Sequence, residues 1–137
     1  MFAQEDRLSG AYIGIALVAL AIGGLMGLFQ ALDHAGLSVY ADIYPWIRSY
    51  YHGLTIHGVL LVLVWTTFFI CGFLTFITTR AYNRPLASPR LSTGAFWVMV
   101  VGLLLAAWPL LTNDATVMFT FYPPLNAHPA FYLGLTL

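Results

Sequence analysis

Two histidines, His52 and His57, stand at the start of a long apolar stretch of the sequence. His57 is followed by a glycine and then by aliphatic residues, so it lies inside the stretch rather than before it. An imidazole in hydrocarbon is costly unless its nitrogens find partners, and an intramembrane histidine is therefore a candidate functional residue. A metal centre is one such partner.

The spacing of the two histidines limits what they can bind. Each residue of an α-helix turns by about 100°, so His52 and His57 point roughly 140° apart and cannot ligate one ion from the same helix. A lone imidazole among aliphatic side chains suits an axial haem ligand, whereas zinc or copper needs more donors nearby. The other interpretation is a histidine that only hydrogen-bonds to a neighbouring helix, and the spacing does not decide between the two.

The remaining candidates have ordinary explanations. His34, His52 and His128 fall in the loops expected on the outer side, where we expect solvated or loop-stabilising histidines rather than metal ligands. Asp114 is expected to face water or to form a surface ion pair. Tyr122 precedes two prolines, which restrict the backbone there; such a segment either covers a cofactor or anchors the chain at the membrane surface.

The composition indicates a membrane protein. Of 137 residues, 61% are hydrophobic and 7% are charged, against about 45–50% and about 25% in soluble domains. The five basic residues, all arginine, balance five acidic ones, so neither nucleic acid nor a polybasic lipid anchor is indicated. The single cysteine, Cys71, excludes an internal disulfide and a dinuclear copper centre built from a cysteine pair.

Three apolar stretches are long enough to cross a bilayer, which takes about 20 residues. They cover about 11–32, 53–79 and 93–111, and a fourth begins near 130. The roughly ten residues of the fourth are too few to cross, so we expect a truncated product, a split subunit or a fragment of a longer polytopic protein. In the first stretch Gly23, Gly24 and Gly27 form a small-residue face, which lets a helix or a flat cofactor approach the backbone.

The connections between the stretches indicate the orientation. The first connection contains Tyr40, Tyr44, Pro45 and Trp46, and is expected to form a short helix at the membrane surface. Three arginines lie in the second connection and one at the N-terminus, against one in the first connection and none after the third stretch. By the positive-inside rule the N-terminus and the second connection are expected in the cytoplasm, which places His57 in the outer leaflet.

The sequence resembles subunit I of the haem–copper terminal oxidases, in particular the ba3-type branch of thermophilic bacteria. The matching motifs include Gly-Leu-Thr-Ile-His-Gly-Val-Leu at 53–60, Pro-Leu-Leu-Thr-Asn-Asp-Ala-Thr at 109–116 and Thr-Phe-Tyr-Pro-Pro-Leu at 120–125. The similarity covers essentially the whole chain. It corresponds to about the first quarter of a subunit that has about a dozen membrane spans in a helical bundle.

The resemblance implies an all-α, polytopic membrane bundle, with residues 1–137 as the N-terminal part of its transmembrane domain. It implies that His57 is one of two axial ligands of a low-spin haem b, with the second ligand on a later helix. Tyr122 matches a tyrosine near the haems and is a second candidate for cofactor contact. His52 stands where relatives carry glutamine, which indicates a residue that binds no metal. The high-spin haem and the active-site copper are expected in the complete subunit, with ligands outside this chain.

The implied activity is that of a proton-translocating cytochrome c oxidase of the aerobic respiratory chain, located in the inner (plasma) membrane. Its implied partners are the remainder of subunit I, a copper-bearing subunit II and cytochrome c as electron donor, and this chain alone is catalytically incomplete. Three alternatives remain. One is a subunit of the nitric oxide reductase type, which shares the low-spin haem helix. The others are a non-enzymatic membrane scaffold and a dihaem cytochrome b, which would need a second buried histidine.

Overall fold

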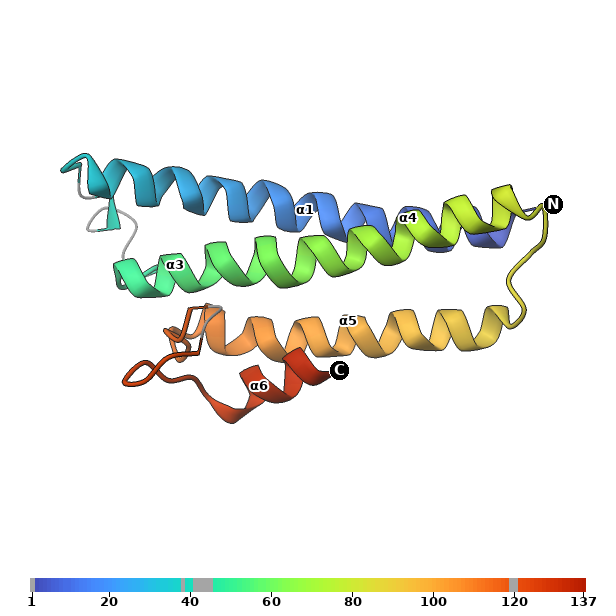
Figure 1. The fold of residues 1–137 in the computed structure, drawn as a ribbon. Helices are drawn as coiled ribbons and strands as arrows, with labels where there is room; N and C mark the ends of the chain where they lie inside the picture. Colours follow the sequence, from blue (N-terminus) through green and yellow to red (C-terminus); the bar gives the residue numbers. More distant parts are fainter. Residues whose placement is uncertain (1, 38, 41–45, 119–120) are drawn as a thin grey trace.

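The computed structural model describes residues 2–37, 39–40, 46–118 and 121–137, and its regular structure there is helical (Figure 1). The elements are α1 (Ala3–His34), α3 (Tyr50–Gly58), the π-helix η1 (Val59–Trp65), α4 (Thr66–Ala81), α5 (Pro89–Leu111) and α6 (Pro129–Thr136). An isolated β-bridge joins Ala115 to Ala127 in the connection between α5 and α6. Because α3, η1 and α4 follow one another without a break, they form one rod.

Three helical rods are long and apolar enough to cross a membrane, namely Ala3–His34, Tyr50–Ala81 and Pro89–Leu111. They lie side by side, with α1 against the second rod and the short α6 against α5 (Figure 1). The expected all-α membrane bundle with three spans and the start of a fourth is therefore confirmed. The rods extend two to eight residues beyond most of the expected boundaries, because hydropathy marks the apolar part of a helix and not the polar residues at its ends.

Serine side chains begin two of the rods. Ser49 precedes α3 and its hydroxyl accepts a hydrogen bond from the His52 amide at 3.1 Å. Ser88 precedes α5 and accepts one from the Leu91 amide at 3.4 Å, with Pro89 in the first turn. Both arrangements satisfy amides that a helix start leaves unpaired. Pro109 lies in the last turn of α5, which ends two residues later.

Glycines bring the first two rods into close contact. A Cβ added at Gly23 would lie 2.8 Å from Cδ2 of Leu61, and one added at Gly72 would lie 3.0 Å from the backbone oxygen of Ser9. At Gly72 the added Cβ would also lie 2.9 Å from the Cβ of Tyr12, so only glycine permits that approach, whereas at Gly23 the nearest atoms belong to the flexible side chain of Leu61. Of the three glycines expected to form a small-residue face, Gly23 and Gly27 pack against the second rod, as is common in membrane bundles, whereas nothing lies within 4 Å of a Cβ added at Gly24.

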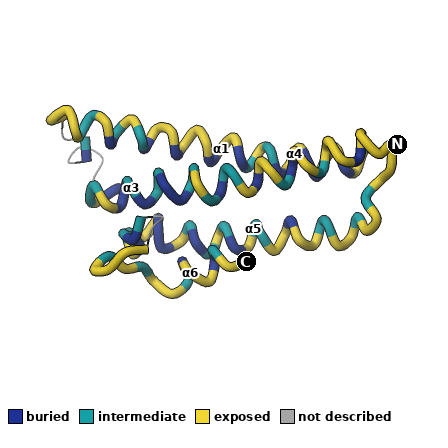
Figure 2. The backbone as a smooth tube through the Cα atoms, in the orientation of Figure 1, coloured by how far each residue is buried: buried dark blue, intermediate teal, exposed yellow. Residues whose placement is uncertain are grey.

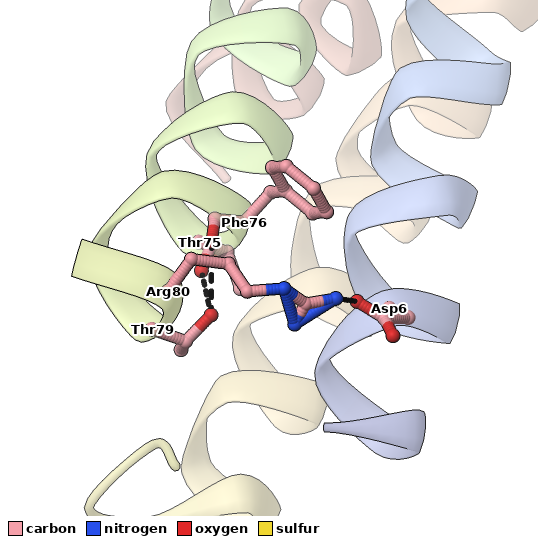
Figure 3. A network of polar contacts seen from close by, with 5 residues as sticks. All are labelled: Asp6, Thr75, Phe76, Thr79 and Arg80. Atoms are coloured by element: carbon pink, nitrogen blue, oxygen red, sulfur yellow. Dashed lines mark hydrogen bonds and ion pairs between the residues drawn. The ribbon is translucent and has the colours of Figure 1, made fainter. Parts of the chain in front are cut away.

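An ionic contact holds the N-terminal end of α1 to the end of α4 (Figure 3). Arg80 donates to a carboxylate oxygen of Asp6 at 2.5 Å, and its guanidinium lies 4.8 Å and 4.9 Å from the ring centres of Phe2 and Phe76. The N-terminus and the loop between α4 and α5 therefore share one end of the bundle. His57 lies in the other half of its rod, towards the α3 end (Figure 1).

Many residues along the three rods are exposed (Figure 2), and many of these are large and apolar. Large hydrophobic side chains such as Val18, Leu28 and Leu104 are more than half exposed. A soluble monomer rarely exposes so much contiguous apolar surface, and the surface agrees with a protein surrounded by lipid or by further membrane helices. The surface helix expected in the first connection includes Tyr44 and Pro45, which lie outside the described residues.

Candidate functional site

His57 is held by the backbone of the neighbouring helix α1. Its Nδ1 atom lies 2.7 Å from the carbonyl oxygen of Gly23. Because a carbonyl oxygen can only accept, Nδ1 carries the proton and donates it in this hydrogen bond. In a neutral imidazole the lone pair is then on Nε2, which is the nitrogen that can bind a metal.

Gly27, one helical turn after Gly23, provides the space for the imidazole ring. A Cβ added at Gly27 would lie 2.6 Å from Cε1 and 2.9 Å from Nδ1 of His57. The ring therefore packs directly on the α1 backbone, where no side chain longer than hydrogen fits. The two glycines fix the ring in complementary ways, one through its carbonyl and the other through its missing side chain.

The free nitrogen of His57 fits an axial haem ligand. Among the described residues no hydrogen bond involves Nε2, and the side chain is only partly buried. A hydrogen bond made by the other ring nitrogen fixes the orientation of a ligating histidine and raises its basicity. The described part of the chain contains no group of three or more His, Cys, Asp or Glu residues placed to hold a metal ion. Among the described residues, the Nε2 lone pair of His57 is therefore the donor that we consider for a metal centre.

A π-helix begins two residues after His57, and the sequence reasoning did not anticipate it. Over Val59–Trp65 the rod leaves the α-helical repeat. The sequence predicts an α-helix over this span, in which each residue turns by about 100°. The run Val-Leu-Leu-Val-Leu-Val-Trp contains no glycine or proline that would mark such a change. The observable sign is at its end, where the Thr66 hydroxyl donates to the Leu61 carbonyl, five residues earlier, at 2.9 Å.

His52 does not lie in an outer loop, which corrects the expectation from the sequence. It is in the first turn of α3, its side chain is 1% exposed, and its Nε2 lies 2.5 Å from the carbonyl oxygen of Leu110. The last carbonyls of a helix have no partner within the helix, and His52 supplies one near the end of α5. The two histidines thus face different helices, as their five-residue spacing predicts.

The other polar candidates lie near helix ends at the same end of the bundle. His34 is the last residue of α1 and stacks on the ring of Tyr50 at 5.8 Å. His128 caps α6, with Nδ1 accepting from the amide of Ala130 at 3.1 Å. Asp114 is exposed and accepts from the Thr112 hydroxyl at 2.9 Å.

Tyr122 is not brought to His57 by the described part of the chain. Its side chain is 67% exposed, and no contact that we observe among the described residues joins it to the imidazole. Its carbonyl accepts from the Leu125 amide at 3.1 Å. The assignment of Tyr122 to a cofactor site stays a prediction.

Two buried polar contacts near His57 were missed from the sequence. The Thr55 hydroxyl is fully buried; it donates to the Tyr51 carbonyl at 2.7 Å and accepts from the amide of Met118 at 2.9 Å. The Gln30 amide donates to the buried Tyr40 hydroxyl. A lone Gln or Thr in an apolar stretch is a weak signal of such a contact, because the partner lies in another element.

Burial raises the pKa of Tyr40, and the charge of Asp33 and the neighbouring Tyr50 raise it further. The hydrogen bond from Gln30 acts in the opposite direction and is the smaller influence. The phenol is thus held in its neutral form. The contact between Gln30 and Tyr40 lies beside Gly53, where an added Cβ would be 2.9 Å from Nε2 of Gln30, and so borders the same helix pair as His57.

A separate apolar cavity of about 400 Å³ lies between the second rod, α5 and α6. Val59, Leu63 and Phe68 line it from the second rod, and Leu103 and Leu135 from the other two elements. His57 is not among its lining residues. The histidine and the cavity are therefore distinct features of the second rod.

Comparison with known proteins gives consistent matches. The family described as "Cytochrome C and Quinol oxidase polypeptide I" matches residues 7–137. The chain is 41% identical over 137 residues to "Cytochrome c oxidase subunit 1" of Thermus thermophilus, covering 97% of this chain and 24% of that protein. It is 28% identical over 120 residues to "Probable cytochrome c oxidase subunit 1-alpha" of Streptomyces coelicolor, covering 84% and 20%.

A solved structure is also similar to this fold. The structure titled "Cryo-EM structure of a heme-copper terminal oxidase dimer provides insights into its catalytic mechanism" matches with a TM-score of 0.86 and 39% sequence identity. The match covers 96% of this chain and 22% of that one. The chain therefore spans about a quarter of the length of the proteins that it matches.

Proposed function

The chain belongs to the cytochrome c and quinol oxidase polypeptide I family, and from this premise we propose that His57 is an axial ligand of a low-spin haem b. The match to a Thermus thermophilus oxidase agrees with the ba3-type branch expected from the sequence. When bound, the haem would supply one-electron transfer. In this proposal the chain is a part of subunit I of a haem–copper oxidase.

The hydrogen bond from His57 to Gly23 is the observation that carries the proposal. It holds the proton on Nδ1 and would leave Nε2 to hold the iron, and the acceptor is a backbone carbonyl that no side-chain substitution in α1 removes. Gly27 keeps the ring against the helix. These two contacts fix both the position and the tautomer of the ligand before a metal binds, so little reorganisation is needed on binding.

We extend the proposal to the complete enzyme. The remainder of subunit I would supply the second axial ligand, the high-spin haem site and the copper ligands. Cytochrome c would deliver electrons through a copper-bearing subunit II, and oxygen reduction would be coupled to proton translocation across the inner membrane. The names of the two relatives, both cytochrome c oxidase subunits, favour this reading over nitric oxide reduction.

Tyr122 is proposed to lie in contact with a cofactor in the complete subunit. Its side chain is largely exposed in this part of the protein, so it is available for contact with elements that follow. The orientation proposed from the arginines puts this loop and the α3 end of the second rod on the outer side, with the N-terminus and the Arg80 contact in the cytoplasm.

The reduced-minus-oxidised optical spectrum of the complete oxidase tests the His57 assignment. His57→Ala is expected to abolish the low-spin haem b band while the protein remains in the membrane. His52→Gln is the matched control, because it changes a buried histidine on the same helix and keeps a donor for the Leu110 carbonyl; its spectrum is expected to equal that of the wild type. A low-spin band that survives His57→Ala would refute the assignment.

A further inference from the structure

Thr66 makes a hydrogen bond that differs from those of the other threonines in the helices of this chain. Its hydroxyl donates to the carbonyl of Leu61, five residues before it, at 2.9 Å. Within the described helices, threonine hydroxyls otherwise reach back three or four residues. These hydrogen bonds run from the threonine hydroxyl to a backbone carbonyl, namely Thr55 to Tyr51, Thr75 to Cys71, Thr78 to Leu74, Thr79 to Thr75 and Phe76, and Thr136 to Leu133. The π-helical repeat, whose backbone bonds reach five residues back, brings the Leu61 carbonyl within reach of the Thr66 hydroxyl.

The Leu61 side chain connects this bond to α1. Its Cδ2 and Cγ atoms lie 2.8 Å and 2.9 Å from the position of a Cβ at Gly23, so Leu61 packs on the bare backbone there. The carbonyl of that same glycine accepts the hydrogen bond from Nδ1 of His57. A continuous series of contacts thus runs from the Thr66 hydroxyl through Leu61 and Gly23 to the imidazole.

The π-helix also sets the rotation between the two halves of the second rod. A π-helix bonds each amide five residues back rather than four, so its residues turn less than the α-helical 100°. Over Val59–Trp65 the difference amounts to about one residue of rotation. His57 precedes this segment and Gly72, which packs on α1 near Ser9, follows it. The π-helix therefore sets the direction of the His57 side chain around the rod axis while α4, the half that follows it, stays packed on α1.

We propose that Thr66 is a positioning residue, whose hydroxyl stabilises the π-helical turn and thereby sets the orientation of the His57 imidazole. The inference rests on the proposed role of His57 as a haem ligand. Thr66 itself makes no contact with His57. It acts through the Leu61 carbonyl and the packing of the Leu61 side chain on Gly23. Neither the family match nor the spacing of the histidines indicates this role for Thr66.

The test compares Thr66→Val with Thr66→Ser in the complete oxidase, by electron paramagnetic resonance of the low-spin haem and by redox titration. Valine keeps the shape and removes the donor, and is expected to shift the g-values and the midpoint potential at unchanged haem content. Serine keeps the donor and is expected to restore the wild-type values. Thr75→Val is the control, because Thr75 makes an ordinary bond to the Cys71 carbonyl at 2.7 Å in the same rod, and it is expected to leave both readouts unchanged.

The outcomes separate this inference from the proposed function. Wild-type g-values and potential in Thr66→Val would overturn the inference, as would an equal shift in Thr66→Ser or in Thr75→Val. If Thr66→Val does not accumulate, Thr66→Ser decides, because the inference requires it to match the wild type. A low-spin signal that persists in His57→Ala, measured in the same series, contradicts the ligand assignment itself.

Discussion

At the scale of single residues, the position of His57 depends on two glycines of α1 with separate roles. Gly23 supplies an acceptor at 2.7 Å, which any residue could supply from its backbone if its side chain fitted. Gly27 supplies only space, since its hydrogen faces the imidazole. The position of the His57 imidazole is therefore sensitive to the size of residue 27.

Gly27→Ala is expected to displace the His57 ring. The added methyl would lie 2.6 Å from Cε1, and overpacking of this kind costs about 1–3 kcal/mol. We expect a lower ratio of low-spin haem to protein, measured by the low-spin band of the reduced-minus-oxidised spectrum of the purified oxidase. Gly14→Ala is the control, because nothing lies within 4 Å of a Cβ at that position of the same helix; an equal haem loss in both variants would contradict the account.

Tyr40 provides a pH-dependent prediction outside the membrane spans. Because burial raises its pKa, the folded protein keeps the phenol proton at a pH where the unfolded chain loses it. Its contribution to stability is therefore complete below the ordinary tyrosine pKa and is lost as pH rises through the higher folded value. Thermal unfolding at increasing alkaline pH should show a steeper loss of stability in the wild type than in Tyr40→Phe. Parallel curves would contradict the raised pKa.

At the scale of elements, the loop after α5 is fastened to α3 by one buried hydroxyl. Thr55 accepts from the amide of Met118 at 2.9 Å, and an unpaired buried amide costs about 1–3 kcal/mol. Thr55→Val is expected to speed hydrogen exchange in the peptide containing Met118, measured by mass spectrometry. Thr78→Val removes an exposed hydroxyl that bonds only to Leu74, and should leave that exchange unchanged. Equal exchange in wild type and Thr55→Val would contradict this role.

The elements differ in how far the sequence could predict them. Hydropathy and length indicated the three rods, since the solvent of a membrane helix imposes an apolar stretch of defined length. The close packing at Gly23 and Gly27 could also be predicted, because small residues four apart indicate close approach of two helices. The π-helix could not, since its aliphatic run looks like any α-helical stretch.

The residues of the candidate site likewise divide into those that the sequence could predict and those that it could not. The lone histidine inside an apolar stretch singled out His57, because hydrocarbon makes such a residue costly. The burial of His52 could not be predicted, since its partner is the Leu110 carbonyl, 58 residues away. The pairing of Gln30 with Tyr40 likewise depends on how the chain returns after α1. Partners of buried polar groups are set by tertiary packing rather than by local pattern.

At the scale of the whole molecule, the bundle has two distinct ends. One end has the ion pair of Arg80 with Asp6, at side-chain exposures of 37% and 46%, and an exposed pair of this kind contributes at most about 1 kcal/mol. The other end holds His57, the buried Thr55 contact and the aromatic residues around Tyr50. Orientation in the membrane therefore decides which side of the bilayer the haem would lie near.

Cysteine labelling tests that orientation. Trp46→Cys and Ala87→Cys change exposed residues at opposite ends of the bundle, in a Cys71→Ala background without other accessible cysteines. With a membrane-impermeant maleimide on intact cells, we expect Trp46→Cys to be labelled at once and Ala87→Cys only after permeabilisation. The reverse pattern would contradict the cytoplasmic N-terminus and place His57 in the inner leaflet.

The most direct test of the central claim is a high-resolution density map of the complete oxidase with its haems bound. We predict that Nε2 of His57 lies at bonding distance from the low-spin haem iron while Nδ1 remains hydrogen-bonded to the Gly23 carbonyl. An iron ligated by a different histidine, with Nε2 of His57 hydrogen-bonded to a protein neighbour, would contradict it.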